Sequence, residues 1–108
     1  MLDFFGAPPD EYTVIFTPNA SAALKLVGEA YPFEPGSHFM LTADNHNSVN
    51  GIREFARARA ADITYVPLEV PELRVDPVAL TAALERAPTG GHHLFAFPAQ
   101  SNLSGVQH

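Results

Sequence analysis

The sequence predicts an α/β domain in which helices flank a mainly parallel sheet. Four short segments are rich in apolar, β-branched or aromatic residues, and a segment with helical periodicity separates each from the next. The strand segments begin about 25 to 30 residues apart, which is the spacing of βαβ units with parallel strands. The predicted strands are residues 12–16, 38–42, 63–66 and 93–97.

The N-terminal part predicts a helix end, a strand and a complete helix. Residues 1–6 resemble the last turn of a helix, because apolar side chains precede Gly6 and glycine often follows a helix end. Residues 12–16 are β-branched and aromatic, which favours a strand. From residue 19 to 31, apolar and polar side chains occupy opposite stripes, and the only lysine, Lys25, lies on the polar one. We therefore expect Lys25 to point to solvent.

The rest of the chain continues the alternation of strands and helices. The apolar strand 38–42 is followed by a polar loop and by a helix that extends to about residue 61. After the third strand, residues 67–75 are irregular and proline-rich. Asp76 and Pro77 then predict a helix start, with a capping carboxylate followed by proline at the first helical position.

Composition excludes several classes of function. With 108 residues, the chain forms at most one small domain. Its net charge of -6 argues against binding to nucleic acid or to an anionic membrane, both of which require clustered positive charge. It has no cysteine, which excludes disulfides and thiolate metal sites, and no apolar run approaches the roughly 20 residues of a membrane span. We expect a soluble, cytoplasmic protein.

Small polar residues follow three of the predicted strands, at residues 17–21, 44–51 and 100–105. In open α/β sheets, ligands bind outside the carboxyl ends of the strands. Together these loops would bring a helix N-terminus, the imidazole of His46 and an amide to one edge of the sheet. They therefore predict one ligand site.

Each loop also has an ordinary structural explanation. Asn19 or Thr17 could simply cap the following helix, and neither a P-loop nor a dinucleotide-binding glycine motif is present. His46 could be a base, a stacking surface or a residue bonded to the backbone; as a metal ligand it lacks a partner at zinc-site spacing, so no metal site is predicted. Residues 100–105 could form a plain surface loop.

Three segments that contain or overlap these loops resemble the class V aminotransferase family of pyridoxal-phosphate enzymes, and within it the cysteine-desulfurase-like domain of molybdenum cofactor sulfurases. They are residues 16–29, 44–49 and 97–105. The resemblance covers nearly the whole chain. It implies part of a large domain of the aspartate aminotransferase-like, fold-type-I transferases, occupying residues 1–108, and the cofactor pyridoxal 5′-phosphate. It also implies a small-molecule substrate, L-cysteine, for sulfur transfer, and a homodimer in the intact protein.

The resemblance assigns roles to five positions. Asn19, Ala20 and Ser21 would hold the cofactor phosphate at a helix start. His46 would stack on the pyridine ring, and Asn102 would reach the phenolic oxygen of the ring.

The chain departs from the family in four residues that have no counterpart up to His108: the Schiff-base lysine, the aspartate for the pyridine nitrogen, the arginine for the substrate carboxylate and the sulfur-accepting cysteine. Lys25 is not the reactive lysine, because it falls in the helix on the phosphate side. We therefore expect a fragment that is inactive by itself, with no catalytic residue of its own. A non-catalytic phosphate-binding module and a remnant of an incomplete gene model remain the alternatives.

The family arrangement has a consequence for the predicted strand 12–16. In the family, this strand is separated from the other three by strands that come later in the sequence. We therefore expect residues 12–16 to lie unpaired or to find another neighbour, and to leave apolar surface exposed.

Overall fold

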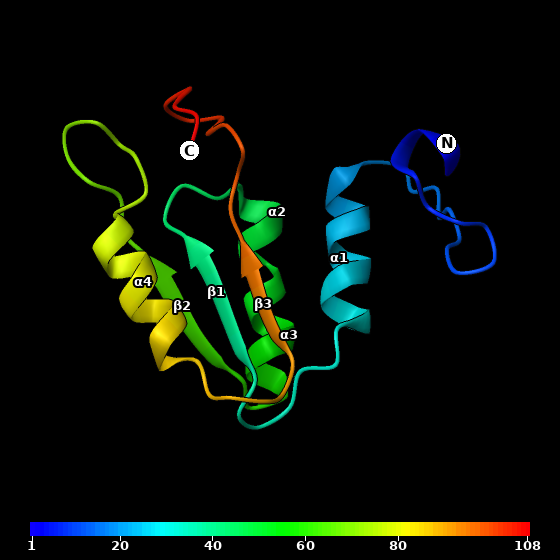
Figure 1. The fold of residues 1–108 in the computed structure, drawn as a ribbon, viewed down its shortest axis with the longest axis horizontal. Coiled ribbons are helices and arrows are strands. Elements are labelled where there is room, and N and C mark those ends of the chain that lie inside the picture. Colours follow the sequence, from blue (N-terminus) through cyan, green and yellow to red (C-terminus); the bar gives the residue numbers. More distant parts are fainter.

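The computed structural model describes residues 1–108 and has helices on both faces of a three-stranded parallel sheet (Figure 1). The strand order is β2-β1-β3, with β1 at His38–Thr42, β2 at Asp62–Val66 and β3 at His93–Ala96. The helices are α1 (Ala20–Ala30), α2 (Asn47–Asn50), α3 (Ile52–Ala58) and α4 (Pro77–Arg86). The predicted α/β class, with parallel strands and flanking helices, is confirmed.

The central strand β1 is buried along its whole length and divides the core into two parts. Phe39 and Leu41 face α1 and α3, where they pack with Ile52 and Ala56. Met40, on the opposite face, packs with Val66 and Ala83 beneath α4. This two-sided burial explains why the three central residues of β1 are all apolar and do not alternate with polar ones.

Helices α1 and α3 approach each other closely at Gly28. This is the only buried residue of α1, and a Cβ atom placed there would lie 2.6 Å from Cδ2 of Phe55. The polar stripe of α1 faces solvent as predicted, and Lys25 forms a 3.4 Å ion pair with Glu29 on that surface.

The helix starts follow their predicted caps. The side chain of Asp76 accepts hydrogen bonds from the N–H groups of Val78 and Ala79 at the start of α4. The helix after the His46 loop is shorter than predicted, since it is divided at Gly51 and ends at Ala58. It ends because Ala60 takes a left-handed conformation with φ of 55°, and the N–H of Ala61 bonds back to the carbonyl of Ala56.

The predicted strand 12–16 is wrong as a regular element, because these residues form no strand or bridge. The expectation that they lie unpaired is confirmed. Ile15 is 71% exposed and Phe16 81% exposed, so an apolar surface remains open. At the N-terminus, the predicted helix end is a short 3₁₀ turn (Asp3–Phe5) that Gly6 closes with φ of 62°.

None of the helices has the length and apolar character needed to span a membrane.

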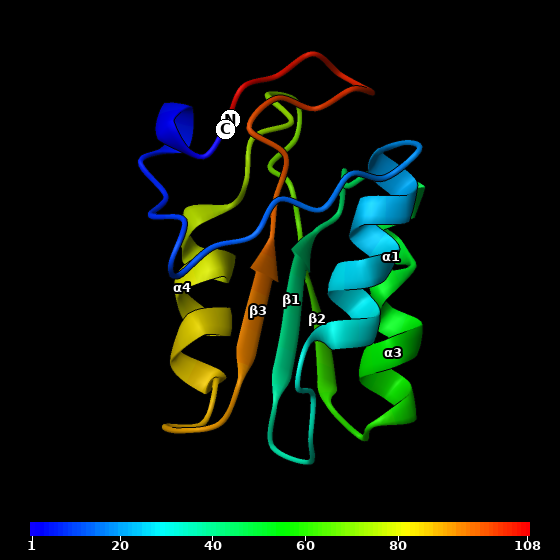
Figure 2. The same cartoon turned by 90° about the vertical axis from the view of Figure 1, so that its right-hand side faces the viewer.

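Figure 2 shows that the start of α1, the carboxyl ends of the strands and the C-terminal hairpin (residues 99–108) all lie at the same end of the sheet. The elements thus bring the three polar loops to one edge.

Candidate functional site

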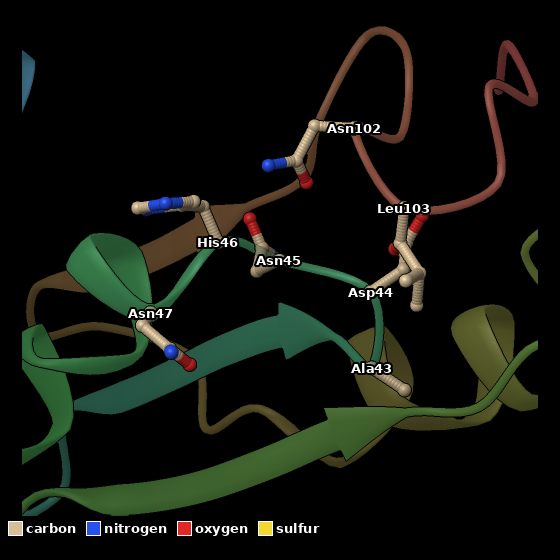
Figure 3. A pocket seen from close by; sticks show the side chains of 7 residues that line it. All are labelled: Ala43, Asp44, Asn45, His46, Asn47, Asn102 and Leu103. Atoms are coloured by element: carbon tan, nitrogen blue, oxygen red, sulfur yellow. The ribbon is translucent and has the colours of Figure 1, made fainter.

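A pocket of about 270 Å³ opens at the carboxyl end of the sheet, between the His46 loop and the C-terminal hairpin (Figure 3). Five of its residues come from the chain that follows β1, and two come from the chain that follows β3. The lining residues are Ala43, Asp44, Asn45, His46, Asn47, Asn102 and Leu103. The structure therefore brings together the two site residues that the sequence predicted on separate loops, His46 and Asn102.

The imidazole of His46 is fixed at one nitrogen and exposed elsewhere. Its Nδ1 accepts a hydrogen bond from the backbone N–H of Ser48 at 3.1 Å, so the side chain caps α2. Because Nδ1 accepts this bond, the ring proton of the neutral imidazole lies on Nε2. His46 is thus bonded to the backbone, one of the alternatives considered from sequence, and this bond orients the ring while its remaining surface stays open.

Ser48 connects the His46 loop to the first polar loop. Its Oγ lies 3.0 Å from Nδ1 of His46 and 2.5 Å from Oγ of Ser21 at the start of α1. Two hydroxyls therefore join the N-terminus of α1 to the imidazole. This serine pair was not predicted from the sequence.

The start of α1 combines a cap with free backbone donors. The side chain of Asn19 accepts a hydrogen bond from the N–H of Ala22 at 2.9 Å, as the capping alternative anticipated. Ala20 and Ser21 occupy the first two helical positions, where N–H groups have no acceptor within the helix. Their donors and the positive end of the helix dipole suit an anion.

Asn45 holds the sheet edge beneath the pocket. Its buried amide nitrogen lies 3.0 Å from the carbonyl of Thr42, 2.9 Å from the hydroxyl of Thr42 and 2.9 Å from the carbonyl of Ala96. It therefore ties the end of β1 to the end of β3. The sequence assigned no role to Asn45, although a polar residue so soon after a mainly apolar strand is a signal that could have identified it.

Asp44 is a buried carboxylate paired with a histidine from the far end of the chain. Its Oδ2 lies 2.7 Å from Nε2 of His108, and the two side chains are 2% and 5% exposed. Burial acts to raise the pKa of Asp44, but the interactions with His108 and with the hydroxyls of Thr42 and Ser101 outweigh it and hold the pKa below its usual value. Asp44 is therefore ionised at neutral pH.

Asn102 is presented by a short hairpin. The residues Gln100 and Gln107 form an antiparallel bridge, and Oγ of the buried Ser101 lies 3.4 Å from the N–H groups of Leu103 and Ser104. The amide of Asn102 has no partner within the protein and points toward the space above His46 and Asn45 (Figure 3). It is free to bond a ligand in that space.

Comparisons with known proteins agree with the resemblance of the three loops. The family model described as Aminotransferase class-V matches residues 2–108. Molybdenum cofactor sulfurase of Arabidopsis thaliana is 38% identical and that of Solanum lycopersicum 41% identical, over 99% and 97% of this chain. The chain spans 15% of the length of each of these two relatives.

A solved structure has the same fold. The cysteine desulfurase CsdA of Escherichia coli superposes with a TM-score of 0.71 at 20% sequence identity, over 98% of this chain and 26% of that chain. The predicted fold-type-I, aspartate aminotransferase-like arrangement is therefore confirmed.

Proposed function

Because the chain belongs to the class-V aminotransferase family, we propose that it forms one wall of a pyridoxal 5′-phosphate site in an enzyme that takes sulfur from L-cysteine. Enzymes of this family depend in general on pyridoxal phosphate. The names of the sulfurase relatives and of the desulfurase with the same fold support the sulfur chemistry. The observation that carries the proposal is the shared pocket of His46 and Asn102, with His46 bonded through Ser48 to the start of α1.

The donors at the start of α1 fit a phosphate group. Ala20 and Ser21 offer backbone N–H groups, and Ser21 adds a hydroxyl. Asn19 acts by holding the first turn of the helix, since its side-chain oxygen is already bonded to the N–H of Ala22. Because Nδ1 of His46 carries no proton, Ser48 donates its hydroxyl proton to this nitrogen and accepts one from Ser21. A phosphate oxygen would replace Ser48 as the acceptor of the Ser21 hydroxyl.

The ring side of the site fits a flat aromatic group. The bond to Ser48 fixes the plane of His46, and the exposed face of the imidazole offers a stacking surface. Asn102 supplies an unpaired amide on the opposite loop, which can donate to a phenolic oxygen. When bound, the cofactor would act as the electron sink, while these side chains orient it.

Binding of pyridoxamine 5′-phosphate, followed by two-dimensional NMR, tests the proposal. The signals of Ser21, His46 and Asn102 should shift together on titration. Ser21→Ala should weaken binding about tenfold through the loss of a bond to a charged group, and His46→Ala about three- to tenfold through the loss of stacking. Asn47→Ala is the matched control, because Asn47 lines the same pocket but has no proposed contact.

The same titration separates the proposal from a non-catalytic phosphate-binding module. Such a module would use Asn19, Ala20 and Ser21 but not His46. If inorganic phosphate competes equally well and His46→Ala has no effect, the module is the better description. If no signal at the pocket shifts, both assignments are wrong.

The 108 residues alone are expected to release no sulfide from L-cysteine. Lys25 is the only lysine, and its side chain is 67% exposed and paired with Glu29 within α1. Incubation with pyridoxal phosphate and L-cysteine, followed by a colorimetric sulfide assay, checks this. Turnover that depends on Lys25 would contradict the assignment.

A further inference from the structure

Three separate segments meet at the imidazole of His108. Its Nε2 contacts Oδ2 of Asp44 at 2.7 Å, and its Nδ1 accepts the backbone N–H of Val75 at 3.3 Å, just before α4. Because Nδ1 is an acceptor, the proton of the neutral ring lies on Nε2 and is donated to Asp44. The side chain of His108 is therefore a bridge between the end of β1, the loop before α4 and the C-terminal hairpin.

The carboxylate of Asp44 is held in an environment that costs free energy. Its Oδ2 is bonded to His108, while its Oδ1 is buried and has no hydrogen bond of ordinary geometry. The hydroxyls of Thr42 and Ser101 are close enough to lower its pKa but do not complete a bond to Oδ1. A half-satisfied buried carboxylate is a poor choice for stability alone, because an apolar side chain avoids the desolvation cost.

The hairpin that carries Asn102 has few other attachments to the body of the protein. Within the hairpin, the N–H of Ser101 bonds the carbonyl of Val106, and the N–H of Gly105 bonds the carbonyl of Ser101. The only other side-chain bond to it from outside comes from the exposed Arg74, which donates to the carbonyl of Gln107 at 2.7 Å. Since a single short hairpin is marginally stable by itself, its position depends on such anchors.

We propose that Asp44 is a positioning residue that, by binding His108, fixes the hairpin of residues 99–108 so that Asn102 stands over His46. The role of Asn102 toward a cofactor rests on the proposed function. The anchoring of the hairpin does not, because it is a property of the chain without a ligand.

Amide hydrogen exchange, measured without ligand, tests the anchoring. His108→Ala removes both bonds of the imidazole without altering the sheet, and exchange at Ser101 and Gly105 should accelerate about ten- to hundredfold, the factor expected for a bond to a charged group. Exchange in β1, at Leu41, should stay the same. Arg74→Ala is the matched control, and its effect should be much smaller because the bond it removes is exposed.

A conservative variant distinguishes anchoring from a general effect on folding. In Asp44→Asn, the amide oxygen can still accept from Nε2 of His108 but carries no charge, so hairpin exchange should accelerate much less than in His108→Ala. In Asp44→Ala, hairpin exchange should accelerate nearly as much as in His108→Ala, because only the longer bond to Val75 remains. The ¹⁵N shifts of His108 should show the Nε2–H tautomer in the wild type, as its bond from the N–H of Val75 requires.

The outcomes separate this inference from the proposed function. If hairpin exchange in His108→Ala stays within about twofold of the wild type, or if β1 loses protection equally, the anchoring is wrong. If exchange changes as expected but pyridoxamine 5′-phosphate never shifts Asn102, the anchoring stands and the cofactor assignment fails. If both hold, His108→Ala should abolish the shift at Asn102 and leave the shift at His46.

Discussion

Substitution of Gly28 tests how closely α1 and α3 pack, and two opposing effects set the outcome. Alanine in a helix interior is favoured over glycine by about 1 kcal/mol. Against this, the new Cβ would lie 2.6 Å from Cδ2 and 3.0 Å from Cε2 of Phe55, closer than carbon atoms approach without displacement. Overpacking of this kind costs about 1 to 3 kcal/mol. We therefore expect Gly28→Ala to lower the free energy of unfolding by about 1 kcal/mol, within a range of about 0 to 2.

Urea unfolding followed by circular dichroism measures this difference, and a second background supplies the control. In a Phe55→Ala protein the ring is absent, so Gly28→Ala should there raise the free energy of unfolding by about 1 kcal/mol. The sign of the effect should thus reverse between the two backgrounds. If Gly28→Ala raises the free energy of unfolding of the wild type by about 1 kcal/mol, the whole gain from the helix propensity of alanine, then α1 does not lie against α3 as closely as the structure places it.

The consequence for the site follows from the position of Ser21. This residue lies at the start of α1 and bonds Ser48, which precedes α3. A displacement of α1 by an added Cβ at Gly28 should therefore disturb the contact between the two serines. Weaker binding of pyridoxamine 5′-phosphate in Gly28→Ala, recovered in the double variant with Phe55→Ala, would show this coupling.

Three further predictions concern the sheet edge, the pH dependence and the open apolar surface. Asn45→Ala should lower the free energy of unfolding, measured in urea, by about 1 to 3 kcal/mol, because buried acceptors lose their donor. Asn45→Asp should lower it further, because a carboxylate would face the carbonyl of Ala96. Burial lowers the pKa of His38; nearby His93 and Arg86 lower it further, and Asp62 partly opposes them. The unfolded chain therefore binds a proton more readily than the folded one, so stability should fall as pH decreases from about 6.5 to the lower folded pKa, and His38→Gln should flatten that part of the profile. Phe16→Ser should reduce self-association in light scattering and leave the midpoint of thermal unfolding unchanged, because the Phe16 side chain is exposed.

Local patterns were sufficient for most elements but not for residues 12–16. Helix starts depend on side chains within one turn, so the cap at Asp76 could be predicted from neighbouring residues. A strand depends on a partner that may lie anywhere in the chain, and β-propensity mainly records how well a residue packs against such a partner. Residues 12–16 have the propensity and no partner, and so they remain irregular.

The same distinction applies to the site. His46 and Asn102 could be predicted to meet, because the carboxyl ends of parallel neighbouring strands share one edge. The bond between Ser21 and Ser48 joins residues 27 positions apart, and the pair of Asp44 and His108 joins residues 64 positions apart. Such pairings follow from how helices and loops pack in three dimensions, and no local pattern in the sequence specifies them.

The distribution of buried polar groups indicates why this edge differs from the rest of the core. Thr42, Asp44, Asn45 and Ser101 are all buried at the carboxyl end of the sheet. Apolar side chains there would avoid the cost of burying polar atoms, so stability alone does not account for them. Asn45 fixes the backbone on one side of the pocket and Asp44, through His108, fixes the hairpin on the other, while His46 and Asn102 themselves stay exposed. Rigid buried anchors beneath free ligand-facing groups are the arrangement that a preorganised binding site requires.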